Sequence, residues 1–296
     1  MAIPDFHPSP ELKRLQAIEL DLFKEFKRVC QKYGLRYFAA GGTMLGAARH
    51  SGFIPWDDDI DVQMYWEDFK VFEEIAQKEF KHPYFYQSFK TDILSDVSPA
   101  ARIRNTETTG CTKWELDNIR NASYNRGIFI DIFLLFPVPD ATDDRVRQKE
   151  RIDRAWRAIR GWYAFQNKLS GVSSSYDQYL GDWEDAGKRY SIEQLKQLYF
   201  EYCDDGGSGS REIGQTSFRT HNPHFMWNRE WFEETVELPF EDITITCPKQ
   251  YDEFLRKQFG DWHTPVFNGS MHEFFIFDTE TPYYKNARLA EQMATS

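Results

Sequence analysis

The feature that most constrains the fold is an apolar run at positions 127–136. Apart from Gly127 and a single carboxylate, Asp131, the run contains only Ile, Phe and Leu, and Pro137 follows it. A short apolar run between such breakers is typical of a strand that is buried on both faces. Burying Asp131 costs free energy unless the carboxylate is ion-paired or metal-bound. Both a structural ion pair and a metal ligand remain open at this position.

The remaining periodicity predicts an α+β fold. Apolar residues three or four apart indicate helices, and polar–apolar alternation indicates strands. We expect a mixed-sheet core over 1–137, a helical segment over 138–210 and a mixed α/β part over 211–296. The expected helices span 12–33, 44–49, 67–79, 140–169, 191–203 and 249–259, and the expected strands span 37–40, 59–64, 84–86, 100–104, 127–136, 235–239 and 243–246.

A cluster of aspartates suggests a metal site. Four of them, Asp57, Asp58, Asp59 and Asp61, lie within five positions. Residues two apart on a strand share a face, so the first, third and fourth would project together. Like charges this close repel unless a cation compensates them, and hard oxygen ligands suit Mg²⁺ or Mn²⁺. With Asp131 from a neighbouring strand, they would form a two-metal site that clamps the attacking and leaving oxygens in phosphoryl transfer.

Aspartates this close together also occur in a solvated loop, in an EF-hand and in prenyl-diphosphate enzymes. A solvated acidic loop is disfavoured because Trp56 precedes the cluster and an alternating strand follows it. An EF-hand would need Gly and Glu where the chain has Val62 and Asp68. The DDxxD spacing of prenyl-diphosphate enzymes is present, but that motif requires a helix and a second acidic motif, which neither 143–144 nor 204–205 completes.

Composition disfavours several functions. The net charge of −11 disfavours nucleic acid as a partner, because phosphate binding needs a basic face. The four cysteines are far apart, which indicates buried thiols rather than a zinc site or disulfides. The aromatic content of 17% would suit a carbohydrate-binding surface, but most rings must be core. The first residues contain no apolar stretch, so we expect no signal peptide, no spanning helix and a cytoplasmic protein.

The motif Gly41-Gly42-Thr43 follows a predicted strand and opens a helix. Glycine lets backbone N–H groups approach a phosphate, and a helix N-terminus favours an anion. Alone the motif is a weak signal, because such a pair is often only a turn. Followed by the aspartate strand, it predicts a phosphate cradle beside a metal platform.

The stretch from Gly41 to Asp61 closely resembles the core signature of the LicD family, which includes bacterial phosphocholine transferases and is similar to fukutin and fukutin-related protein. A second match lies at 127–133, and looser ones lie at 101–106 and 247–262. The chain departs from the pattern at Ala40 and Ala48, and at 134–137, where Leu-Leu-Phe-Pro replaces a Pro-Leu-Asp ending. These departures concern the fine substrate assignment.

The resemblance implies a nucleotidyltransferase-like fold and transfer of a substituted phosphate. The donor would be a CDP-activated alcohol such as CDP-choline or CDP-ribitol, and the acceptor a sugar hydroxyl on a glycan. A lipid-linked glycan acceptor would be met at the membrane surface by peripheral contact. The family's metal-site roles map onto Asp59 and Asp61, with Asp57 and Asp131 as partners.

We therefore expect a LicD-type phosphotransferase whose catalytic residues are Asp59, Asp61 and Asp131, with Asp61 or Asp131 as the general base. Arg49, Arg102 and Arg104 are expected donor-phosphate contacts, although ordinary salt-bridge roles fit them equally well. Two alternatives remain open. One is a nucleotidyltransferase that makes the CDP-activated donor from CTP and releases pyrophosphate rather than CMP. The other is a non-catalytic glycan-binding protein.

Overall fold

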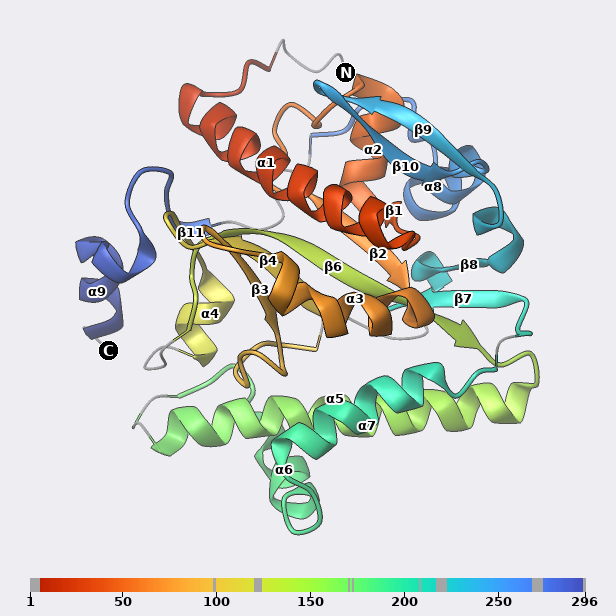
Figure 1. The fold of residues 1–296 in the computed structure, drawn as a ribbon. Helices are drawn as coiled ribbons and strands as arrows, with labels where there is room; N and C mark the ends of the chain where they lie inside the picture. The colour runs from red at the N-terminus through yellow and green to blue at the C-terminus, as the bar shows by residue number, and fades with distance from the viewer. Residues whose placement is uncertain are drawn as a thin grey trace.

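The computed structural model describes residues 6–97, 100–119, 124–169, 171, 173–207, 209–216, 223–267 and 274–294. Its helices are α1 (Pro10–Tyr33), α2 (Gly41–His50), α3 (Trp66–Glu79), α4 (Lys113–Asn118), α5 (Thr142–Leu169), α6 (Leu180–Ala186), α7 (Ile192–Asp204), α8 (Tyr251–Phe259) and α9 (Ala287–Ala294). Its strands are β1 (Phe38–Ala39), β2 (Asp61–Tyr65), β3 (Tyr84–Ser88), β4 (Ala101–Asn105), β5 (Thr109–Thr112), β6 (Ile128–Val138), β7 (Glu212–Gln215), β8 (Met226–Asn228), β9 (Thr235–Phe240), β10 (Ile243–Pro248) and β11 (Phe274–Asp278). Figure 1 shows their arrangement.

The centre of the fold is a 7-stranded mixed sheet with the order β1-β2-β6-β4-β3, which β7 and β8 extend from β6. In the part of the chain that the structure describes, β2 and β6 run parallel and the other neighbours in this sheet run antiparallel. Every residue of β6 is buried, as its apolar run predicts. The α+β class and the buried central strand are therefore confirmed.

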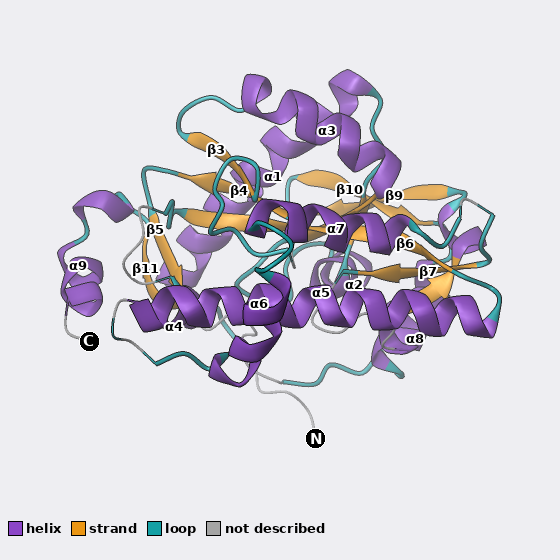
Figure 2. Ribbon diagram, turned by 90° about the horizontal axis from the view of Figure 1, so that it is seen from below, coloured by secondary structure: helices purple, strands orange, loops and turns teal. Residues whose placement is uncertain are grey.

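Helices cover this sheet. Helices α1 and α3 pack against β6, while α5, α6 and α7 form a helical layer that reaches the same strand through α7. Figures 1 and 2 show α5 and α7 running side by side. A small sheet of β9 and β10 lies beside α2 and β1, and a second one pairs β5 with β11.

The N-terminal helix α1 ends where the sequence predicts and begins at Pro10, two residues before the predicted start. The Ser9 side chain accepts a hydrogen bond from the backbone N–H of Leu12 at 3.1 Å, which caps the helix. Gly34 ends the helix in the left-handed region, at φ 65°, where glycine carries no Cβ penalty. Within the described residues, no helix combines the length and apolar character needed to cross a bilayer.

Candidate active site and metal centre

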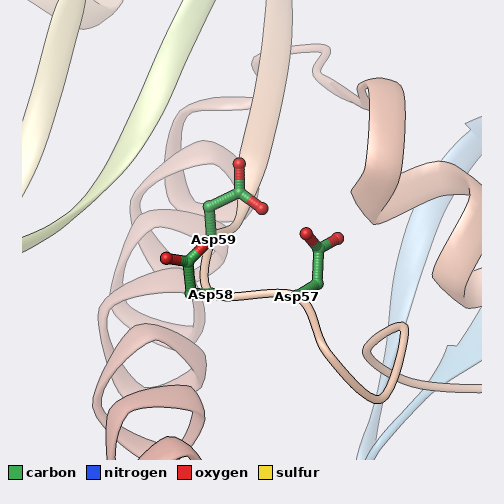
Figure 3. Close-up of side chains that lie close together, drawn as sticks. All are labelled: Asp57, Asp58 and Asp59. Atoms are coloured by element: carbon green, nitrogen blue, oxygen red, sulfur yellow. The ribbon is translucent and has the colours of Figure 1, made fainter. Parts of the chain in front are cut away.

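Three consecutive aspartates converge in the loop between α2 and β2. One carboxylate oxygen each from Asp57, Asp58 and Asp59 lies within 4.8 Å of the others (Figure 3). The prediction that a strand begins at residue 59 is wrong, because β2 begins at Asp61. A turn closed by the N–H of Asp57, which donates to the carbonyl of Ile54 at 2.9 Å, lies just before the triplet, and residues 57–60 are irregular. The strict alternation of a strand therefore does not apply here, and Asp58 joins the triplet whereas Asp61 does not.

The electrostatics of this triplet favour a cation. Burial and the adjacent charge of Asp59 raise the pKa of Asp57 to about 9. Asp58 is also buried, whereas Asp59 is half-buried. Without a cation, the cluster therefore retains a proton near neutral pH. An all-oxygen donor set of this kind fits Mg²⁺ or Mn²⁺, and it gives no preference for zinc.

Glycines at the start of α2 leave room for these carboxylates. A Cβ placed on Gly42 would lie 2.8 Å from Oδ2 of Asp57, closer than side-chain atoms can approach. Gly41 has a φ of 44°, in the left-handed region that favours glycine. The backbone N–H of Asp61 donates to Oγ1 of the buried Thr43 at 2.8 Å, which fixes the start of β2 against α2. The helix begins at Gly41 rather than at residue 44, so the motif forms its first turn.

Asp131 lies beside Asp61, as predicted. The two residues are register partners on β6 and β2, and the N–H of Asp131 donates to the carbonyl of Ile60 at 3.1 Å. On its other side, Asp131 is the register partner of Arg102 on β4. The Arg102 Nε donates to Oδ1 of Asp131 at 2.7 Å, and both side chains are buried. Asp131 is thus adjacent to the carboxylate loop and also part of a buried ion pair, although it is not a member of the triplet.

A second buried acid, Glu115, connects this ion pair to Arg104. Its Oε1 lies 3.4 Å from NH1 of Arg102 and also accepts from NH2 of Arg104. Burial opposes ionisation of Glu115, but the two guanidinium groups lower its pKa below the ordinary range. Glu115 was not among the site residues that we predicted. The available signal was the capping-box spacing of Thr112 and Glu115 at the start of α4.

The structure corrects the expected role of Arg104. Its side chain has no exposed surface, and NH1 donates to the carbonyl of Gly127 at 2.8 Å. The ring centroid of Phe129 lies 4.5 Å from the guanidinium carbon of Arg104. A donor molecule cannot reach an arginine enclosed in this way, so Arg104 is a structural cation rather than a donor-phosphate contact.

Arg49 lies at the far end of α2 from the glycines, about 12 Å along the helix axis. Its NH1 donates to the carbonyl of Trp262 at 2.8 Å, which ties α2 to the segment after α8. Burial lowers the pKa of Arg49, and burial together with Arg49 lowers the pKa of the neighbouring His50. A donor contact from Arg49 would have to be made at this distant end of the helix.

Part of the chain is similar to a known protein family. Residues 34–156, which run from before β1 into α5 and include the carboxylate loop and Asp131, match the family described as LicD/FKTN/FKRP, nucleotidyltransferase domain. This match includes the signature at 41–61 and is in agreement with the resemblance that the signature indicates.

Individual relatives agree with this resemblance. The chain is 26% identical over 267 residues to the lipopolysaccharide cholinephosphotransferase LicD of Haemophilus influenzae, which covers 85% of this chain and 91% of that protein. A shorter stretch of 51 residues is 45% identical to the ribitol 5-phosphate transferase FKRP of Homo sapiens, covering 17% of this chain and 10% of that protein. An uncharacterized protein of Rickettsia typhi, RT0683, is 41% identical over 54 residues, which is 18% of each chain.

Proposed function

We propose that this protein is a metal-dependent enzyme that transfers a substituted phosphate, such as phosphocholine, from a CDP-activated alcohol to a sugar hydroxyl. The acceptor would belong to a cell-surface glycan or its precursor. The observation that carries the proposal is the convergence of Asp57, Asp58 and Asp59 beside the glycine start of α2. Similarity over most of the chain to a relative named as a cholinephosphotransferase supports phosphocholine as the group transferred.

In this proposal the carboxylates and α2 bind the donor together. A divalent cation held by the triplet would neutralise charge on the donor diphosphate. The start of α2 lies against Asp57, and its first N–H groups and glycines would let a phosphate approach the backbone closely. Thr43 keeps β2 in place through its bond to the N–H of Asp61, so that the cradle and the carboxylates keep a fixed spacing.

The transfer itself needs an acceptor to lose a proton. The acceptor oxygen forms a bond to the phosphorus that carries the alcohol, the bond from that phosphorus to the bridging oxygen breaks, and CMP leaves. Asp61 or Asp131 would take the proton. The Arg102 guanidinium donates to Oδ1 of Asp131 at 2.7 Å, so one oxygen of this carboxylate is already engaged. We therefore favour Asp61 as the general base, since its backbone N–H is fixed by Thr43 at the start of β2.

A second candidate function keeps the same site. The matching family is described as a nucleotidyltransferase domain, so synthesis of the CDP-activated donor from CTP remains an alternative. A non-catalytic glycan-binding protein would not need a buried carboxylate cluster, and metal titration separates it from both enzymes.

Product analysis tests the proposal. The protein would be incubated with Mg²⁺ and either CDP-choline, CDP-ribitol, or CTP with phosphocholine. Release of CMP from a CDP-alcohol supports the phosphotransferase, whereas pyrophosphate from CTP with formation of CDP-choline supports the alternative. Neither product, together with no binding of Mg²⁺, would support the glycan-binding protein. Any requirement for a lipid-linked acceptor is tested by adding vesicles that carry the glycan.

A further inference from the structure

Three aromatic rings meet next to the carboxylate loop. Trp56 directly precedes Asp57, and its ring centroid lies 5.8 Å from that of Phe6 and 5.3 Å from that of Phe267. The centroids of Phe6 and Phe267 are 5.9 Å apart. These residues come from the segment before α1, the carboxylate loop and the segment after α8. We call this set of three side chains the aromatic corner.

The rings of the aromatic corner do not form a flat stack. The plane of Trp56 is inclined by 83° to Phe6 and by 66° to Phe267. With all three centroids this close, one group placed over the corner lies within about 6 Å of every ring, which is the range of a cation–π contact. The planes of Phe6 and Phe267 are inclined by 36° to each other, so Trp56 stands against a pair of tilted rings. A quaternary ammonium group would lie on the exposed side of this set.

Exposure separates the aromatic corner from the core. Phe6 is 36% exposed and Phe267 is 56% exposed, and the adjacent Val266 is 62% exposed. Trp56 is half-buried and packs partly against the core. The larger part of an apolar side chain such as Phe267 is left in water here, although most large apolar side chains of the described chain are buried. This surface is therefore available to a ligand.

The protein's own cations do not cover these rings. Elsewhere guanidinium groups lie over aromatic faces, as Arg160 does over Trp156 at 4.8 Å and Arg151 over Tyr202 at 4.2 Å. Within the described residues, no lysine or arginine lies over a ring of the aromatic corner. The carboxylates that begin at Asp57 add negative potential next to it, which favours a cationic ligand.

We propose that Phe6, Trp56 and Phe267 bind the quaternary ammonium group of a choline phosphate donor. The inference rests on the proposed function, because it places the headgroup of the transferred phosphocholine beside the carboxylates that would hold the cation for its phosphate. A choline nitrogen is only a few bonds from its phosphorus, and Trp56 is the residue next to Asp57. The aromatic corner would then select a choline headgroup over a neutral alcohol such as ribitol.

A pair of isosteric ligands tests this assignment without turnover. Phosphocholine and 3,3-dimethylbutyl phosphate have the same shape, but carbon replaces the charged nitrogen in the second. Calorimetry with the Mg²⁺-loaded protein should show phosphocholine binding tighter by roughly threefold to thirtyfold. Phe267→Leu and Phe6→Leu, which keep an apolar side chain, should bring this ratio close to one and leave binding of the neutral isostere unchanged. Tyr284→Leu is the matched control, since Tyr284 is 57% exposed and outside the corner, and it should keep the ratio.

The outcomes are distinct. Equal affinity for the two ligands in the unmodified protein, or an unchanged ratio in both variants, overturns the proposal. If CMP release from CDP-choline is retained in that case, the proposed function stands and the headgroup binds elsewhere. The protein could instead prefer phosphocholine through Phe267 and yet show no turnover of CDP-choline. That result would support binding of the ammonium group at the aromatic corner and contradict the proposed function. Sedimentation with choline-free vesicles of phosphatidylethanolamine and phosphatidylglycerol, lost in Phe267→Leu, would assign the patch to a lipid surface and overturn the proposal.

Discussion

Asp61 and Asp131 are direct register partners on the parallel strands β2 and β6. Their side chains therefore share one face of the sheet, although the two residues are far apart in the chain. Arg102 occupies the next register position on β4 and bonds Asp131. Two acids and one base thus lie in a row across the sheet. The guanidinium of Arg102 balances part of the repulsion between the two carboxylates.

Removing one charge from the carboxylate loop should abolish turnover while the fold survives. Asp59→Asn and Asp61→Asn both keep the size of the side chain. Asp59→Asn weakens its affinity for a divalent cation, and Asp61→Asn removes the proposed general base. We expect a loss of at least about a hundredfold in CMP release, with a far-ultraviolet circular dichroism spectrum like that of the unmodified protein. Glu230→Gln, an acid on the surface away from the loop, serves as the control. An active Asp59→Asn enzyme would place the metal platform elsewhere.

The stability of the metal-free protein should depend on pH through Asp57. Its pKa in the folded protein is raised to about 9, from an ordinary value of 3.8. The folded state therefore holds this proton more tightly than the unfolded state does. The stabilisation is fully present below a pH of 3.8 and is lost as the pH rises through about 9. In EDTA, the Tm of the unmodified protein should fall over this range more steeply than that of Asp57→Asn.

Adding Mg²⁺ provides the second arm of that experiment. A bound cation stabilises the charged carboxylates, so the difference between the two pH profiles should shrink. Identical profiles for the unmodified protein and Asp57→Asn in EDTA would contradict the buried, proton-retaining cluster. Measuring the difference between two proteins cancels the titration of other groups, including Lys196, whose pKa burial lowers to about 7.

Much of the secondary structure could be predicted from local pattern. The apolar run at 127–136 corresponds to β6, and Gly34 ends α1, because both signals depend on neighbouring residues alone. The start of β2 was misplaced for a similar reason. Alternation at 59–64 looks the same in a strand and in the loop that precedes it, and the close approach of Asp57 to the start of α2 is a tertiary contact.

The ion-pair network could not be predicted from the sequence. Arg104 and Glu115 lie on different elements, and only the pairing of β4 with β6 and the position of α4 bring them together. The sequence pattern around an arginine in a strand is the same whether its side chain contacts a donor phosphate or a buried acid. The aromatic corner has the same origin, since Phe6 and Phe267 are far apart in the chain.

Replacing Asp131 separates its two roles. Asp131→Asn leaves Arg102 with a weaker partner, although Glu115 remains 3.4 Å away. We expect a loss of about 3 kcal/mol in the free energy of unfolding, measured with urea. We also expect the turnover of the folded fraction to fall by at least about tenfold, because the site then lacks the second carboxylate that could take the acceptor proton beside Asp61. Full turnover per folded molecule would leave Asp131 with a structural role alone.

Arg104→Met tests the corrected role of that arginine. The change leaves a buried Glu115 without its shorter ion pair, so we expect a loss of about 3 kcal/mol in the free energy of unfolding. The KM for CDP-choline should stay within about twofold in the folded protein, since the side chain is enclosed. Arg49→Met is the comparison, with a smaller stability loss expected at a half-buried site. A large rise in KM for Arg104→Met would restore it as a donor contact.

In the proposed function, the clustered carboxylates bind a divalent cation, and transfer of a substituted phosphate from a CDP-alcohol requires this cation. The most direct measurement is CMP release from CDP-choline by the purified protein, first in Mg²⁺, then in excess EDTA, and then after Mn²⁺ is added back. We predict CMP release in Mg²⁺, loss of release in EDTA and recovery in Mn²⁺. The Asp59→Asn protein should release no CMP with either metal. Undiminished CMP release in excess EDTA would contradict this requirement for a cation.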